Sequence, residues 1–147
     1  MITSADEALL RRAIGLAARA VTLGDAPYGS LLAGPDGTVL AEAHNTVRRD
    51  DDITAHPELK LARWAARELD PETAARTTLY TSCQPCGMCD GGIIRSGIGR
   101  VVYALSTEQL IALNPPSGAW PTVPHDGPAL HEEAHAPVAA YYGGGRA

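Results

Sequence analysis

The chain has 147 residues, of which 45% are hydrophobic and 20% are charged, so its length and composition fit one globular domain and exclude an intrinsically disordered chain. The formal net charge is −5, and the basic residues are scattered along the chain, which argues against binding to nucleic-acid phosphates. No apolar run reaches the ~20 residues of a membrane helix, and the N-terminus lacks the apolar region of a signal peptide. We therefore expect a cytoplasmic protein that contacts neither a membrane nor a polyanion.

The first third of the chain predicts a helix followed by a β-hairpin. Ser4 and Glu7 have the spacing of a capping box, and apolar residues then recur at helical intervals, which predicts a helix over 5–23. Two short extended segments follow, at 30–33 and 38–43. The sequence Gly-Pro-Asp-Gly between them is typical of a tight turn, so the two segments should pair as a hairpin.

The middle of the chain predicts alternating helices and strands. Apolar residues at helical spacing indicate a helix over 57–69, in which Pro57 stands at the start, where no amide donor is needed. A β-branched strand at 77–81, a helix over 85–96 and a strand at 100–105 come next. This order implies two parallel strands joined by a right-handed crossover.

The C-terminal part is the least clearly patterned. A short helix is expected over 107–113, and a Pro- and Gly-rich stretch occupies 114–128. Residues 130–135 favour a helix, whereas 137–142 fit either a strand or a helix. We expect a single domain over 1–147, with 114–147 as its least defined segment.

Two short motifs carry metal-binding residues, and each stands at a predicted helix start. The first is His56-Pro57-Glu58, and the second is Pro85-Cys86-Gly87-Met88-Cys89. All three cysteines of the chain lie between positions 83 and 89, which is too local for a disulfide framework and suits metal or redox chemistry. Each motif alone has little specificity, because a Cys-x-x-Cys pair is also found in redox sites and structural zinc sites.

Together the two motifs predict a zinc site with an open position. Cys86 and Cys89 share one face of a helix, so both sulfurs reach one ion, and His56 supplies a third ligand. Three protein ligands leave one tetrahedral position for water, which is the arrangement of catalytic zinc, and Glu58 is then a proton carrier. For Cys83 we favour a small buried hydrophobe, although spacing alone also allows a site formed by Cys83 and Cys86.

These motifs resemble the His-x-Glu and Pro-Cys-x-x-Cys signature of the cytidine deaminase superfamily of zinc-dependent nucleobase deaminases. The pattern is nearest to the branch of bacterial guanine deaminases and yeast-type cytosine deaminases. The resemblance also includes Pro27-Tyr28-Gly29, the hairpin at Gly37, His44-Asn45, Leu79-Tyr80-Thr81 and Val101-Val102-Tyr103. It covers about two-thirds of the chain and fades after Leu105.

The resemblance implies a fold and a set of site residues. The fold is an α/β class, a three-layer α/β/α sandwich with a five-stranded mixed sheet, assembled as a homodimer. His56, Cys86 and Cys89 would bind Zn²⁺, and Glu58 would act as general acid and base. Asn45 would hydrogen-bond the base, with His44 beside it in a pair similar to that of the cytosine branch.

Two further substrate-binding candidates lie in the C-terminal part. Glu108 is near the position of an acidic residue of the family, while Glu132 and Glu133 are looser candidates. Trp120 stands in a Pro-rich loop, where it either stacks on a flat substrate or packs the loop onto the domain. Three departures from the family pattern are Pro57 in place of alanine, Gln84 in place of an acid, and a C-terminal segment that does not align clearly.

We therefore expect a hydrolase that uses zinc and water to deaminate a small aminated heterocycle and release ammonia, with a free base such as guanine favoured. The alternative substrates are cytosine, another pyrimidine or an aminotriazine. A deaminase that edits tRNA or single-stranded DNA is less favoured, because the chain has no basic cluster. Two other classes remain open, a non-catalytic zinc-stabilised binding domain and a thiol redox protein.

Overall fold

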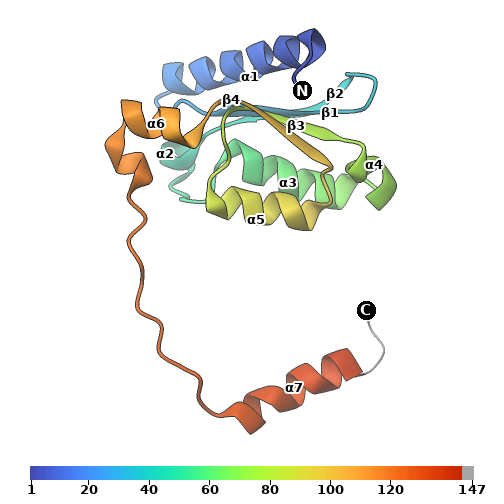
Figure 1. The fold of residues 1–147 in the computed structure, drawn as a ribbon, viewed down its shortest axis with the longest axis vertical. Coiled ribbons are helices and arrows are strands. Elements are labelled where there is room, and N and C mark those ends of the chain that lie inside the picture. The colour runs from blue at the N-terminus through green and yellow to red at the C-terminus, as the bar shows by residue number, and fades with distance from the viewer. Residues whose placement is uncertain (144–147) are drawn as a thin grey trace.

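A mixed β-sheet with helices on both faces forms the centre of the molecule (Figure 1). The computed structural model describes residues 1–143. The elements in chain order are α1 (Ser4–Thr22), β1 (Gly29–Ala33), β2 (Val39–His44), α2 (Val47–Asp50), α3 (Pro57–Glu68), α4 (Pro71–Ala75), β3 (Thr78–Cys83), α5 (Gly87–Ser96), β4 (Arg100–Leu105), α6 (Thr107–Leu113), the short 3₁₀ helix η1 (Pro115–Gly118) and α7 (His131–Gly143).

The strand order in the sheet is β2-β1-β3-β4. Strand β1 pairs antiparallel with both β2 and β3, which confirms the predicted hairpin. Strands β3 and β4 are parallel and are connected through α5, as the order of strand, helix and strand predicts. Helix α1 covers one face of the sheet, whereas α3 and α5 cover the other (Figure 1). The three-layer α/β/α architecture is therefore confirmed.

The central strand β1 contributes side chains to two hydrophobic clusters, one on each face of the sheet. All of its residues are buried, and consecutive side chains point to opposite faces of the sheet. Leu31 packs on the α1 side with Leu10 and Val102, and Leu32 packs on the other side with Leu61. Trp64 of α3 is half-buried against this second cluster.

The N-terminal cap of α1 differs by one residue from the prediction. The capping box is formed by Thr3 and Asp6 rather than by Ser4 and Glu7. The physical reason is the burial of Asp6, which is only 4% exposed and also accepts hydrogen bonds from Tyr80 and Arg100. A side chain that faces the sheet is fixed in place for capping, whereas Glu7 is exposed.

Residues 1–143 contain four strands, not the five that the family resemblance implies. After β4, the chain enters α6 at once through a capping box made by Ser106 and Gln109. The following stretch is rich in Pro and Gly and contains no extended run of β-branched residues that could pair with β4. The segment 137–142, which fitted either a strand or a helix, is helical and belongs to α7.

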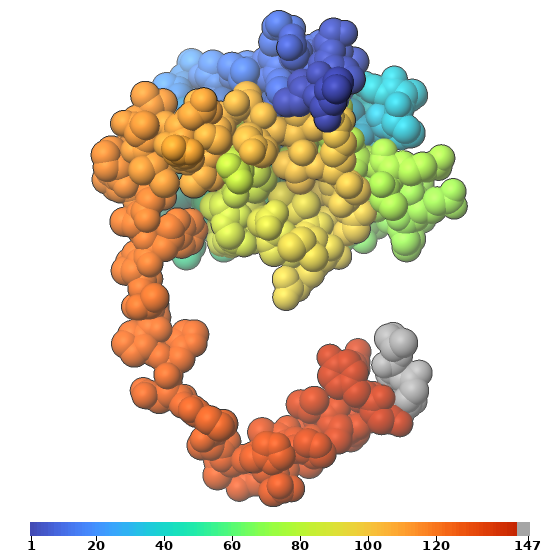
Figure 2. Space-filling model, in the orientation of Figure 1, coloured from blue at the N-terminus to red at the C-terminus, as the bar shows by residue number. Residues whose placement is uncertain are grey.

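A C-terminal arm, defined here as residues 119–143, leads away from the domain (Figures 1 and 2). It consists of an extended segment and α7, and its large apolar side chains are exposed, including Trp120 at 66% and Tyr142 at 71%. The predicted helix at 130–135 is confirmed as the start of α7, except that Leu130 precedes it. None of the helices within residues 1–143 is long and apolar enough to cross a membrane.

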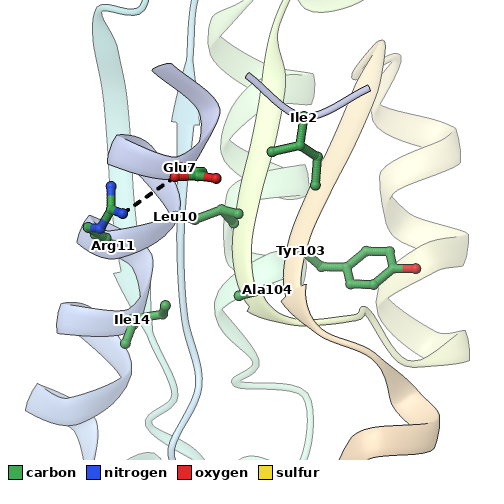
Figure 3. Close-up of a pocket in the computed structure, with 7 residues that line it drawn as sticks. All are labelled: Ile2, Glu7, Leu10, Arg11, Ile14, Tyr103 and Ala104. Atoms are coloured by element: carbon green, nitrogen blue, oxygen red, sulfur yellow. Dashed lines mark hydrogen bonds and ion pairs between the residues drawn. The ribbon is translucent and has the colours of Figure 1, made fainter. Parts of the chain in front are cut away.

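A hollow of about 340 Å³ lies between α1 and β4 (Figure 3). Its wall contains apolar side chains of both elements, with an ion pair between Glu7 and Arg11 at the edge. The lining residues are Ile2, Glu7, Leu10, Arg11, Ile14, Tyr103 and Ala104. The hollow is on the α1 side of the sheet, whereas the two metal-binding motifs belong to the helices on the opposite side.

Candidate active site

The two motifs meet because their helices pack against each other and begin at the same end. His56 is the N-cap of α3, and Pro57 occupies the first helical position, as predicted. Cys86 is the N-cap of α5, and Cys89 lies in its first turn. Helices α3 and α5 are in contact along their length. The positive ends of both helix dipoles therefore face the same point, which favours anionic groups there.

The three predicted metal ligands converge. The Nδ1 atom of His56 lies 3.7 Å from the sulfur of Cys86 and 3.4 Å from the sulfur of Cys89. All three ligand atoms lie within 4.8 Å of one another, so one ion could contact all of them. Cys83 is buried at the end of β3 and is not part of this group, in agreement with its interpretation as a small buried hydrophobe.

The charges of the cluster fit a divalent cation. Hydrogen bonds from Cys89 and His56 lower the pKa of Cys86, so this thiol ionises readily. The neighbouring Cys86 sulfur, burial and the Glu58 carboxylate raise the pKa of Cys89. The bond to Cys86 also raises the pKa of His56. The protein alone therefore stabilises one thiolate, and a second thiolate requires an opposing charge such as that of Zn²⁺.

Glu58 lies beside the cluster and is only 5% exposed. Its Oε1 atom accepts hydrogen bonds from Thr81 at 2.8 Å and from Ser30 at 3.2 Å. A buried carboxylate that is held by hydroxyl groups and lies next to metal ligands is suited to carry a proton. Sequence reasoning did not identify Ser30, because a serine in a strand gives no signal of its own.

Asn45 stands at the end of β2 and is 2% exposed. Its main-chain N–H donates to the carbonyl of Tyr28 at 2.9 Å, and its side-chain Oδ1 accepts from the N–H of Val47 at 3.0 Å. The side-chain carbonyl is therefore engaged within the chain, which leaves the amide NH₂ as the donor for a ligand. The Nδ1 atom of His44 lies 3.1 Å from the carbonyl oxygen of Asn45, so the two residues of the pair are in contact.

Two charged residues that sequence reasoning missed hold the loop after Asn45. Lys60 donates from Nζ to the carbonyl of His44 at 3.0 Å and to the Thr46 hydroxyl at 2.5 Å. The buried Asp25 accepts from the main-chain N–H groups of Arg48 and Arg49 at 3.0 and 3.2 Å. The sequence signal for Lys60 was its position on the same helix as Glu58, one turn after His56.

Tyr28 also borders the site. Burial raises its pKa, and the negative charges of Cys83, Glu58 and Cys86 raise it further, which places the phenol close to these groups. Its main-chain carbonyl accepts a hydrogen bond from the N–H of Asn45, so the Pro-Tyr-Gly segment connects Asn45 to β1. The sequence signal for this residue was the resemblance of Pro27-Tyr28-Gly29 to the family.

Glu108 and Trp120, the two C-terminal candidates for substrate binding, are not buried in the structure of a single chain. Glu108 lies on α6 and is exposed. Gln84 ties this helix to the motif, since its side-chain oxygen accepts from the N–H of Thr107 at 3.0 Å. Trp120 lies at the start of the C-terminal arm and is 66% exposed. Within one chain the structure thus brings together His56, Glu58, Cys86 and Cys89, but leaves Trp120 open to solvent.

Comparisons with known proteins agree with this geometry. Residues 3–105 match the family model described as the cytidine and deoxycytidylate deaminase zinc-binding region. A probable cytosine deaminase of Schizosaccharomyces pombe is 34% identical over 99% of this chain and 97% of its own length. A tRNA-specific adenosine deaminase of Haemophilus influenzae is 35% identical over 69% of this chain and 58% of its own length.

A solved structure extends the likeness to the fold. The crystal structure of guanine deaminase from Bacillus subtilis superimposes with a TM-score of 0.78 at 30% sequence identity, covering 93% of each chain. The matched family segment contains both metal-binding motifs and all four strands. The chain therefore belongs to the cytidine and deoxycytidylate deaminase family of zinc-binding domains.

Proposed function

We propose that this protein is a zinc-dependent hydrolase that deaminates a free nucleobase, with guanine as the favoured substrate, and releases ammonia. The observation that carries this proposal is the convergence of His56, Cys86 and Cys89 beside the buried carboxylate of Glu58. In this proposal, the three ligands would hold Zn²⁺ and leave one coordination position open. The ion, when bound, acidifies a water molecule.

Glu58 then moves protons between water and the base. Its carboxylate accepts a proton from water and donates it to a ring nitrogen, then takes the remaining proton of the added hydroxyl group and passes it to the departing amine. Burial keeps this exchange away from bulk solvent, since Glu58 is 5% exposed. The two hydroxyl groups at Oε1 keep the carboxylate in the site.

Asn45 supplies a hydrogen bond that helps to recognise the base. Because its Oδ1 atom already accepts from Val47, the free NH₂ group is the part that donates to a ligand. A donor at this place pairs with an acceptor atom of the base, either a carbonyl oxygen or an unprotonated ring nitrogen. This contact orients the ring, and it does not by itself distinguish guanine, cytosine and adenine.

Guanine is supported by the likeness in fold to the guanine deaminase of Bacillus subtilis, which covers 93% of this chain. Cytosine is the second candidate, because the Schizosaccharomyces pombe relative aligns over 99% of this chain. A tRNA substrate is less favoured, since the net charge is −5 and the alignment with the tRNA deaminase spans only 69% of the chain.

We also propose that the protein is a homodimer in which the C-terminal arm of one copy covers the other. The arm leaves the domain and exposes Trp120, Leu130 and Tyr142, at 66, 70 and 71% (Figure 2). Exposed apolar side chains of this extent indicate an interface. In the dimer, Trp120 of a second copy would stack on the base, and Glu108 would face it from α6. Sedimentation equilibrium of the full chain tests this assembly, and a monomer at micromolar concentration would contradict it.

The proposed activity is tested by ammonia release from a panel of guanine, cytosine, adenine, their nucleosides and aminotriazines. The zinc-loaded wild type should turn over one ring class, and a chelator should abolish turnover. Glu58→Gln should retain zinc and fold but lose activity by about 10²-fold or more, because the proton carrier is gone.

Two outcomes would contradict the proposal. Equal activity of Glu58→Gln and wild type would exclude Glu58 as the proton carrier. Zinc binding without turnover of any panel member would favour a non-catalytic binding domain. Glu68→Gln is a matched control, because this glutamate lies exposed at the end of the same helix.

A further inference from the structure

Two buried hydroxyl groups approach the same oxygen atom of Glu58. Ser30 on β1 and Thr81 on β3 are directly opposite each other in the antiparallel pairing, and both are 0% exposed. The Thr81 hydroxyl lies 2.8 Å from Oε1 of Glu58 and 2.8 Å from the Ser30 hydroxyl. The Ser30 hydroxyl lies 3.2 Å from the same Oε1. The three side chains thus connect the sheet to the first turn of α3.

The direction of these hydrogen bonds follows from counting protons. Each hydroxyl has one proton to donate. Among the hydrogen bonds of residues 1–143, the Thr81 hydroxyl donates to Oε1 of Glu58, whereas the Ser30 hydroxyl has both Thr81 and Glu58 as acceptors. The shorter distance favours donation from Ser30 to Thr81. The resulting chain runs from Ser30 to Thr81 to Glu58.

This direction fixes the catalytic carboxylate. Oε1 is an acceptor in this arrangement, while neither hydroxyl contacts Oε2. A glutamate side chain otherwise rotates broadly about its terminal torsion, so the hydroxyl chain selects one orientation of the carboxylate plane. The other oxygen, Oε2, to which neither hydroxyl donates, is then held at a constant position relative to His56 and Cys89.

We propose that Thr81 and Ser30 are positioning residues that hold Oε1 of Glu58 and leave Oε2 to exchange protons with water and base. This inference rests on the proposed function, in which Glu58 carries the proton. Thr81 acts directly on the carboxylate, and Ser30 acts through Thr81. Both residues contribute to the rate of proton transfer rather than to binding of the base or the metal.

The first test is the steady-state kinetics of Thr81→Val with the best substrate of the panel. The kcat should fall about 10- to 100-fold, as expected for a catalytic group that loses its orientation, while KM stays within about threefold. Thr81→Ser restores the hydroxyl and should recover most of kcat. Ser30→Ala should cause a smaller loss, because the Ser30 hydroxyl donates to Thr81 rather than directly to Glu58 in the wild type.

Thr77→Val is the matched control. Thr77 is also 0% exposed, but its hydroxyl donates to the carbonyl of Thr73 at 2.9 Å, outside the site. This variant loses a buried hydroxyl of the same kind and should keep kcat at the wild-type value. Zinc content should remain equal in all variants. An unchanged kcat in Thr81→Val, or a kcat that Thr81→Ser does not recover, would overturn the proposal.

A second measurement does not depend on activity. The urea midpoint of the metal-free protein is compared for wild type, Thr81→Val, Glu58→Ala and the double variant. Thr81→Val should lower the midpoint less in the Glu58→Ala background, because its hydroxyl has already lost its acceptor there. Equal shifts in both backgrounds would overturn the hydrogen bond itself. If the wild type deaminates nothing, the proposed function fails, and this cycle still decides whether the hydroxyl holds Glu58.

Discussion

Lys60 anchors the loop that presents Asn45, and its replacement by methionine should weaken binding of the base. The ammonium group donates to the carbonyl of His44 and to the hydroxyl of Thr46, the two residues that flank Asn45. Burial lowers the pKa of Lys60, whereas the negative charges of Asp50 and other acids favour its charged form. Methionine keeps the length and packing of the stem and removes only the charged donor.

The expected size of the effect on KM follows from the two hydrogen bonds that Lys60 donates. A hydrogen bond to a charged group contributes about 1.5–3 kcal/mol, but Lys60 is half-exposed, so water replaces part of this loss. We expect the loop to be destabilised by about 1–2 kcal/mol, which corresponds to roughly a 5- to 30-fold rise in KM if it is transmitted to Asn45. The kcat should change by less than about threefold, because Glu58 and the metal ligands keep their own contacts.

The assay is steady-state ammonia release as a function of base concentration. Arg67→Met is the matched control, since it removes one positive charge from an exposed position of the same helix. The control should leave KM unchanged. A Lys60→Met enzyme with normal KM, or with a lower kcat at normal KM, would refute the assignment of Lys60 to the substrate-binding loop.

Three further predictions concern stability. Hydrogen bonds from Arg100 and from Thr3 keep the pKa of Asp6 well below its usual range, so Asp6→Asn should cost about 2 kcal/mol in urea unfolding of the metal-free protein at pH 7. This stabilisation is present above the unfolded pKa of about 4 and is lost as the pH falls toward the folded pKa, so an undiminished cost at pH 3 would contradict it. Gly29→Ala should cost about 1–3 kcal/mol, because a Cβ there would lie 2.5 Å from the carbonyl oxygen of Ala13. Gly15→Ala, which meets nothing within 4 Å, should raise the thermal midpoint instead.

The convergence of His56, Cys86 and Cys89 could be predicted from the sequence because the signals for these three residues are local. His56 and Cys86 each stand at a helix start, and both helix starts are marked by a proline. Capping and periodicity depend on neighbouring residues, so α3, α5 and the crossover between β3 and β4 could all be predicted. The exact N-cap of α1 could not be predicted, because Thr3 and Ser4 offer equivalent hydroxyl groups. Only the tertiary burial of Asp6 distinguishes the two positions.

The groups around Glu58 were not predictable, because they depend on strand register. Ser30 and Thr81 are 51 residues apart in the chain and become neighbours only when β1 and β3 pair. A shift of one residue in this pairing would put the two hydroxyls on opposite faces of the sheet, so that only one of them could face α3. Lys60 was missed for a similar reason, since its acceptors belong to a loop 14 to 16 residues away. The predicted number of strands was wrong because it came from the family resemblance, which fades after Leu105.

In the proposed function, chemistry and substrate choice arise in different parts of this chain. The metal ligands and Glu58 belong to α3 and α5, between β2 and β4, and lie inside the segment that matches the family model. In the proposed function Asn45 donates to an acceptor atom of the base, a contact that does not distinguish a purine from a pyrimidine. Contacts that distinguish them must come from groups around the open side of the site. Residues 106–143 lie beyond the matched segment and hold the exposed Glu108 and Trp120. Exchanging these residues should change which base is deaminated while leaving zinc affinity intact, because none of the three ligands lies among them.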